Sequence, residues 1–90
     1  MVEPYRDAPH SQQQFVRVFD HSVEPTELVW HRDRRHRSIR VVRSEGWQLQ
    51  FDNCLPTVLM PGQQLEIEAK TWHRVIKGEG DLEIEITEWE

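Results

Sequence analysis

Hydrophobic and polar residues alternate along most of the chain. The clearest example is "WQLQFD" (47–52), in which Trp47, Leu49 and Phe51 alternate with polar residues. Because successive side chains of a strand point to opposite faces, a period of two is typical of half-buried β-strands. Further short strands are predicted at 15–20, 27–33, 38–43, 64–69, 72–77 and 82–89, with another inside 53–62.

Turn residues separate these segments at intervals of roughly 8–12 residues, as in all-β sandwiches and barrels. No segment of useful length repeats its apolar residues with the period of a helix. The pattern therefore predicts an all-β fold over residues 15–90, as a single domain. Because open sheet edges promote aggregation, we expect a closed barrel or edges paired in a dimer. Residues 1–14 are polar, with two prolines, so we expect a flexible N-terminal arm.

Size and charge narrow the range of functions. A chain of 90 residues has a thin core and gains stability from a partner subunit. The formal charge of −5, from 11 basic and 16 acidic residues, argues against a general nucleic-acid binder, whose surface is normally positive.

Cysteine content and the N-terminus bear on the compartment. The single cysteine, Cys54, excludes an internal disulfide and Cys-based zinc motifs. The segment "MVEPYRDAPH" (1–10) lacks the apolar core of a signal peptide, and no apolar run is long enough to span a bilayer. We therefore expect a soluble, cytoplasmic protein.

The segment "WHRDRRHRS" (30–38) holds four arginines, two histidines and one aspartate. In an extended strand, His31 and Asp33 share a face, because side chains two residues apart point the same way. His73, in "TWHRV", shares its face with apolar Val75, so its ring is expected to point inward and to need a polar partner. Two histidines and one carboxylate form a triad that suits Fe(II) and, with less preference, Mn, Ni or Zn.

These residues also carry a resemblance to the cupin family, covering about two thirds of the chain, from Leu28 to Thr87. The first cupin motif is His-x-His with a Glu four residues later, and it falls without a gap on His31, Asp33 and Arg37. The strand "IRVV" and the turn glycine Gly46 follow. The likeness is to small single-domain cupins, including proteins of phage type.

The second cupin motif resembles "PGQQLEIEAKTWHRV" (61–75). Pro61-Gly62 takes the place of the turn, Ile67 that of the central strand residue, and His73 that of the metal-binding histidine. The resemblance implies a small β-barrel of the double-stranded β-helix, or jelly-roll, type. It also implies a homodimer in which the N-terminal strand 15–20 pairs with the partner.

The chain departs from the family at the ligand positions. Two of the four positions keep histidine (His31 and His73), and one carries Asp33, which can still bind a metal. The fourth carries Arg37, which cannot. Arg37 could pair with Asp33, since arginine and carboxylate form strong bidentate contacts, or it could anchor a substrate carboxylate.

Two further residues are candidates for ligand binding. Trp72 is an aromatic residue beside His73, and His36 lies in a predicted turn (34–37) that could swing toward the site. The tryptophans Trp30, Trp47 and Trp72 are expected in the core or a dimer contact. No catalytic residue and no organic cofactor follow from the sequence.

Three functions stay open. The first is a small-ligand-binding cupin, with or without a divalent metal at His31, Asp33 and His73. The second is a metal-dependent enzyme of oxygenase or isomerase type. The third is a metal-free structural or interaction protein that binds an acidic partner through its arginine-rich turn. In the plainest interpretation, the site is a hydrogen-bonded polar cluster, and the arginines face the glutamate-rich strands across the sheet.

Overall fold

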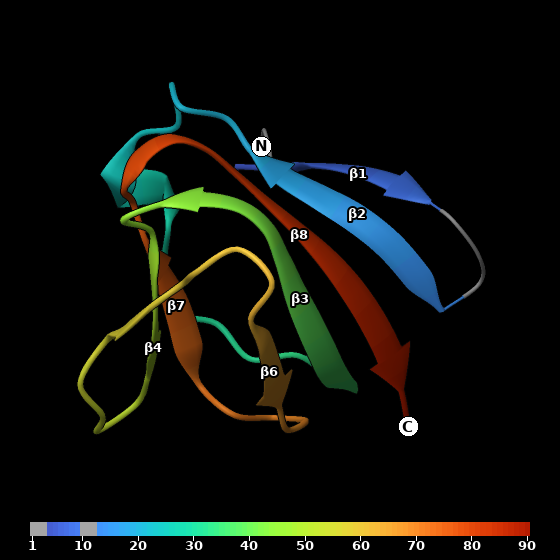
Figure 1. Ribbon diagram of the computed structural model, residues 1–90. Helices are drawn as coiled ribbons and strands as arrows, with labels where there is room; N and C mark the ends of the chain where they lie inside the picture. Colours follow the sequence, from blue (N-terminus) through green and yellow to red (C-terminus); the bar gives the residue numbers. More distant parts are fainter. Residues whose placement is uncertain (1–3, 10–12) are drawn as a thin grey trace.

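The protein folds into two antiparallel β-sheets (Figure 1). The computed structural model describes residues 4–9 and 13–90. The strands are β1 (Arg6–Pro9), β2 (Gln14–Phe19), β3 (His36–Glu45), β4 (Gln48–Phe51), β5 (Thr57–Val58), β6 (Gln64–Ile67), β7 (His73–Ile76) and β8 (Glu79–Trp89). A 3₁₀ turn spans Pro25–Glu27. No helix in these described ranges is long and apolar enough to cross a membrane.

The larger sheet has the strand order β1-β2-β8-β3-β6, and the smaller has the order β5-β4-β7. In Figure 1 the long strands β8 and β3 curve across one side of the molecule, and β4 and β7 lie on the other. The prediction of an all-β fold is confirmed.

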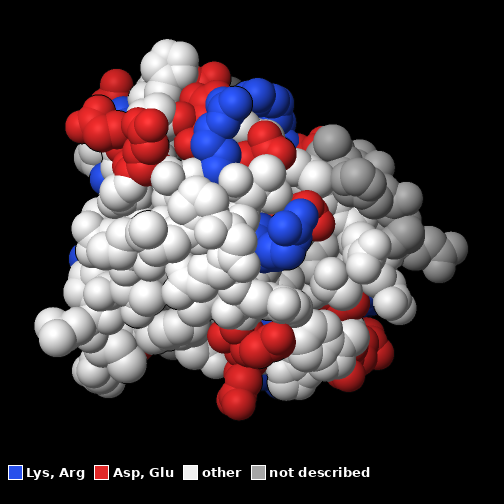
Figure 2. Space-filling view, in the orientation of Figure 1, with Lys and Arg blue, Asp and Glu red and all other residues white. Residues whose placement is uncertain are grey.

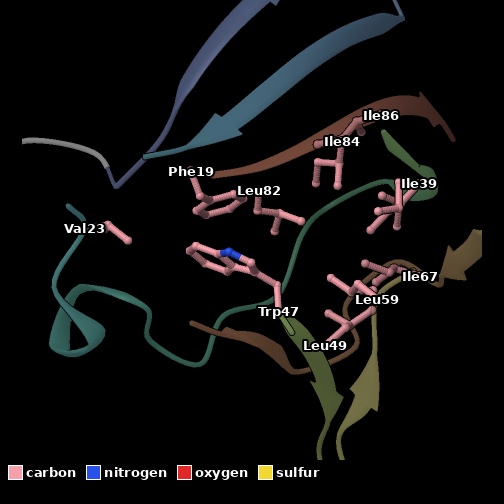
Figure 3. Close-up of a cluster of buried hydrophobic side chains, with 11 residues drawn as sticks. Phe19, Val23, Ile39, Trp47, Leu49, Leu59, Ile67, Leu82, Ile84 and Ile86 are labelled. Carbon is pink, nitrogen blue, oxygen red and sulfur yellow. The ribbon is translucent and has the colours of Figure 1, made fainter. Parts of the chain in front are cut away.

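The core lies between the two sheets, as Figure 3 shows. The inward positions of β8 are Leu82, Ile84 and Ile86, which alternate with acidic residues on the outer face. Trp47 is fully buried against Phe19, with ring centroids 5.9 Å apart, and its indole N–H donates to the carbonyls of the β8 residues Glu79 and Gly80. The alternation in the sequence therefore predicted the core face of these strands correctly.

The predicted strand at 27–33 was wrong. Pro25 fixes its own φ and begins the 3₁₀ turn, in which Leu28 N–H donates to the Pro25 carbonyl (3.1 Å). The chain then runs irregularly to the bend at 34–35. Only His31 pairs like a strand residue, through an isolated antiparallel bridge to His73.

The N-terminal segment also differs from the prediction. Within the expected arm, Arg6–Pro9 form β1, which pairs with β2. Residues 1–3 and 10–12 lie outside the described residues. Strand β2 is paired on both sides, with β1 and with β8, so it has no free edge for the partner strand expected at 15–20. A homodimer stays a prediction.

Two of the three tryptophans expected in the core or a dimer contact lie at the surface of the chain. Trp30 is 39% exposed and Trp72 43% exposed, and each carries an arginine over its ring: Arg74 over Trp30 and Arg32 over Trp72. Each tryptophan directly precedes one of the inward-facing histidines: Trp30 precedes His31, and Trp72 precedes His73. The strand phase that turns these histidines inward turns both tryptophans outward.

Charged side chains are distributed unevenly. Arginines of β3 face acids of β8 across the sheet, as in the pair Arg40–Glu85, so this part of the plain interpretation of the arginines is confirmed. In contrast, the segment 46–65 contains one charged residue, Asp52. Figure 2 shows acidic and basic groups together at the upper edge and a broad uncharged area over β4 and the chain that follows it.

Two glycines are required by the backbone. Gly46 has φ +75° in the turn between β3 and β4, where the resemblance placed a turn glycine. Gly78, between β7 and β8, lies against the neighbouring turn, where a Cβ would come within 2.3 Å of the Glu45 carbonyl oxygen. Glycine at 78 therefore allows the backbone between β7 and β8 to lie directly against the turn between β3 and β4.

Candidate metal centre

His31, Asp33 and His73 lie together at one end of the barrel interior. The bridge between the two histidines places them: His31 N–H donates to the His73 carbonyl (3.0 Å), and His73 N–H donates back to the His31 carbonyl (2.9 Å). Their ring centroids are 4.2 Å apart. Lys70 N–H holds the carbonyl of Asp33 (2.7 Å). One potential ligand atom from each of the three residues lies within 4.8 Å of the others.

Each histidine uses its Nδ1 for a backbone carbonyl two residues earlier. His73 Nδ1 lies 2.7 Å from the Thr71 carbonyl oxygen, and His31 Nδ1 lies 3.2 Å from that of Val29. When a neutral imidazole donates from Nδ1, its Nε2 keeps a free lone pair. This arrangement, in which one ring nitrogen is fixed by a carbonyl, is the usual setting of a metal-binding histidine.

Asp33 points its Oδ2 at both His73 and Arg37. Oδ2 lies 3.3 Å from His73 Nε2 and 3.2 Å from Arg37 Nη1, yet it is buried without a well-aligned hydrogen bond from any described residue. Burial acts to raise the pKa of Asp33, but the hydrogen bond that His73 Nε2 donates when its ring is protonated, together with the charge of Arg37, outweighs burial and holds the pKa below its ordinary value. The carboxylate is therefore ionised near neutral pH, and its Oδ2 is available to bind a cation.

The pKa of His31 is lowered as well. Burial of the ring is the main cause, because it disfavours the charged form. The positive charge of Arg37 acts in the same direction, whereas the Val29 carbonyl and Asp33 oppose it. A neutral His31 is the form that can bind a metal.

Arg37 lies on β3 and bridges two acids. Its Nη1 contacts Asp33, and its Nε donates to Glu88 Oε2 on β8 (2.8 Å). The side chain is mostly buried, with 13% of its surface exposed. The pairing with Asp33 expected from the sequence is present, but Glu88 makes the shorter contact.

A partly open cavity of about 330 Å³ adjoins this cluster. His31, Asp33, Arg37 and His73 form its polar end, and Val29 lies beside them. The larger part of its wall is the apolar interior of the two sheets. A metal held at the polar end would therefore face a cavity whose wall is largely apolar.

Two candidate residues are not brought to this cavity. His36 opens β3 instead of lying in a turn; its Nδ1 accepts a hydrogen bond from Ala69 N–H (3.1 Å), and its ring stacks on Trp89. Trp72 lies at the outer surface under Arg32. Neither lines the cavity in the described structure, so their proposed role in ligand binding finds no support in the geometry.

Two polar residues near the site, Glu88 and Arg17, were not predicted from the sequence. Glu88 lies opposite Arg37 in the β3–β8 register. Arg17 lies on the inward face of β2 and lines the cavity, with Nε and Nη2 bound to the two carboxylate oxygens of Asp7 (3.0 and 3.3 Å). A signal for Arg17 existed, because in the strand "FVRVF" (15–19) it lies two residues from Phe15 and from Phe19 and so shares their face.

A second group of potential ligands, Asp20, His21 and Asp81, lies at the surface. Asp81 Oδ1 accepts hydrogen bonds from the backbone N–H of His21 (2.7 Å). This hydrogen bond lowers the pKa of Asp81. The geometry of the group is explained by these contacts alone.

Comparisons with known proteins place the fold. No protein-family model matches the chain, and no curated protein matches it. An RmlC-like cupin from Shewanella frigidimarina NCIMB 400 is 17% identical with a TM-score of 0.69, over 93% of this chain and 73% of that one. At this identity the likeness concerns the fold alone: the chain has the cupin fold.

Two longer proteins have the same fold in part. A structure of DMSP lyases gives a TM-score of 0.71 at 17% identity, and covers 86% of this chain but 37% of that one. The Fe(II) form of HppE gives 0.66 at 15% identity, over 94% of this chain and 48% of that one. The chain thus spans less than half of either protein.

Proposed function

We propose that this protein binds a divalent metal ion through His31, Asp33 and His73, and binds a small ligand in the adjoining cavity. One observation carries the proposal. His73 Nδ1 lies 2.7 Å from the Thr71 carbonyl oxygen, and in the neutral tautomer that donates there, the Nε2 lone pair faces Asp33 Oδ2 at 3.3 Å. Two lone pairs at that distance repel each other unless a cation, either a proton or a metal ion, lies between them.

The donor set favours Fe(II). Two neutral imidazoles and one carboxylate, with the remaining positions open, are the ligands that non-haem Fe(II) commonly takes, while Mn, Ni and Zn are alternatives. The similarity of fold to the Fe(II) form of HppE supports the same choice. A bound ion would supply Lewis acidity and open positions for a ligand oxygen.

Arg37 has a defined role in this proposal. In its place a glutamate would add a fourth ligand, whereas the guanidinium adds a positive charge. Glu88 offsets that charge, which leaves the Asp33 carboxylate for the metal. The charge balance therefore tolerates a divalent ion despite the arginine.

A metal-dependent enzyme of oxygenase or isomerase type is the second candidate. The largely apolar cavity beside the cluster favours it, because a low local dielectric strengthens electrostatic effects on a bound substrate. The fold shared with the DMSP lyases and with HppE is consistent with it. A screen of oxygen uptake by the iron-loaded protein would test the oxygenase form.

Metal content tests the main proposal. Protein purified without chelator and reloaded anaerobically with Fe(II) is expected to hold one ion per chain. His31→Ala and His73→Gln are expected to lose most of it, since loss of a ligand lowers affinity by several orders of magnitude more than loss of an outer contact, which costs about 10–100-fold. Circular dichroism checks that both variants fold.

Two histidines outside the cluster provide the controls. His36→Ala removes a nearby histidine that contacts Ala69 and Trp89. His21→Ala removes the histidine of the surface group. Both are expected to keep their metal. Equal metal content in wild type, His31→Ala and His73→Gln would refute the triad, and loss in His21→Ala alone would assign the ion to the surface group.

A further inference from the structure

Most of the cavity wall beyond the metal centre is hydrocarbon, and its polar members are Tyr5, Arg17 and Glu27. It is built mainly by six side chains of the two sheets, each at most 6% exposed: Phe19, Ile39, Leu49, Ile67, Ile84 and Ile86 (Figure 3). Among the described residues, no serine, threonine, asparagine, glutamine or lysine lines it. A ligand with several hydroxyl groups would leave them without partners, which is costly in an apolar site.

The polar groups of the cavity are largely committed to one another. Arg17 is held by Asp7 through two nitrogens, and its guanidinium carbon lies 3.5 Å from the centre of the Tyr5 ring. At the other end, Arg37 is shared between Asp33 and Glu88. Glu27, the other acid in the wall, is exposed to solvent. Specific recognition of a ligand therefore depends on the metal centre.

Charge balance at that centre defines the ligand further. With both histidines neutral, Asp33, Arg37 and Glu88 carry one net negative charge. A divalent ion would change this to one net positive charge. Because an uncompensated charge in an apolar interior is unfavourable, a ligand with one negative charge completes the site.

We propose that the ligand of this site is a small monocarboxylate, or an equivalent monoanion, whose anionic head binds at the metal and whose body is aliphatic or aromatic. The proposal rests on the metal centre of the proposed function and names its ligand class. The cavity of about 330 Å³ limits the ligand to roughly ten non-hydrogen atoms, taking about 30 Å³ for each with its hydrogens. Sugars and sugar phosphates are excluded by the apolar wall and by charge.

Three probe molecules distinguish the contribution of the anionic head of the ligand from that of its hydrocarbon body. The metal-loaded protein is titrated calorimetrically with 4-methylpentanoate, with its neutral counterpart 4-methylpentan-1-ol, and with glucose 6-phosphate. The carboxylate is expected to bind about 10-fold more tightly than the alcohol, since only it neutralises the centre, and more tightly still than the sugar phosphate. An alcohol that binds as tightly as the acid, or a sugar phosphate that binds more tightly, would overturn the proposal.

A matched pair of substitutions tests the charge argument. Arg37→Gln removes the positive charge and should narrow the preference for acid over alcohol. Glu88→Gln removes a negative charge and should widen it. A change of the same sign in both variants, or no change in either, contradicts the charge argument.

A larger side chain in the wall tests whether the ligand body lies in the cavity. Val75→Phe, which fills part of the cavity, should weaken carboxylate binding about 10-fold while metal content is unchanged. Leu28→Phe serves the same purpose if Val75→Phe does not fold.

Metal content is measured on every sample, so that the two proposals fail separately. If wild type holds its ion but binds no probe, the ligand class is wrong and the metal centre stands. If wild type holds no ion at His31, Asp33 and His73, the proposed function is wrong and the ligand class falls with it.

Discussion

Arg37 determines how the metal centre differs from a site with four protein ligands. Its guanidinium contacts Asp33 on one side and Glu88 on the other, so it orients the carboxylate of the proposed metal centre and opposes a cation there at the same time. The sequence identified Arg37 as the exceptional residue, because it occupies a position where a glutamate ligand was expected. The sequence did not identify Glu88, since that contact depends on the β3–β8 register.

We expect Arg37→Gln to increase metal affinity. The substitution removes a charge next to the carboxylate and frees Glu88, and at an effective dielectric constant of about 20 such a charge contributes a few kcal/mol at short range. The expected gain is about 10-fold or more by calorimetry with Mn(II). Arg40→Gln, which removes an exposed arginine paired with Glu85, should leave affinity unchanged. A loss of affinity in Arg37→Gln would contradict this role for Arg37.

The two lowered pKa values predict acid sensitivity of the metal-free protein. His31 binds a proton less readily when folded, so the unfolded chain takes up more protons as the pH falls below about 6.5, and stability decreases. The lowered pKa of Asp33 acts in the same direction below about pH 3.9. Urea unfolding should therefore show declining stability from pH 7 to pH 5, and His31→Asn should reduce that decline. Stability that rises on acidification would refute the assignment.

At the scale of elements, alternation predicted strands well wherever one face of the strand is buried and the other is solvated. The segments 47–52 and 82–89 correspond to β4 and β8 for this reason. The segment 27–33 has a similar pattern but is not a strand, because the turn at Pro25 and the bend at 34–35 leave it only the bridge at His31. That bridge keeps the residue extended, so the expected placement of His31 and Asp33 was right although the strand was not.

The same reasoning explains why β1 was missed. Arg6–Pro9 is polar and contains proline, and its pairing with β2 depends on contacts with residues outside the segment, such as that of Asp7 with Arg17, ten positions later in the sequence. Hydrophobic pattern does not report such contacts. Tertiary pairing, rather than the local sequence, makes this segment a strand.

The close approach of two turns at Gly78 leads to a prediction about the free energy of unfolding. A Cβ at 78 would overlap the backbone of Glu45 and Trp47, at 2.3 and 2.4 Å, so the turns must separate. We expect Gly78→Ala to lower the free energy of unfolding by about 1–3 kcal/mol or more, as overpacking does. In Gly46→Ala only the positive φ is strained, since no atom lies within 4 Å, and its cost should be about 1 kcal/mol. Equal thermal shifts in the two variants would contradict the close approach.

At the scale of the whole molecule, the small size of the chain shapes what it can do. Its radius of gyration is 12.2 Å, and a cavity of about 330 Å³ occupies an interior that would otherwise add to the core. Filling this space with a ligand buries further apolar surface and favours the folded state. The fold could be predicted from patterning and resemblance, whereas the cavity and its charge balance depend on which side chains meet across the two sheets.

The central claim is that one metal ion is held by His31, Asp33 and His73. The most direct measurement is anomalous diffraction from a crystal grown anaerobically with Fe(II), recorded on both sides of the iron absorption edge. We predict a single anomalous peak about 2.0–2.3 Å from His31 Nε2, Asp33 Oδ2 and His73 Nε2. An Asp33 carboxylate hydrogen-bonded to Arg37 and His73, with no anomalous peak between the histidines, would contradict the claim.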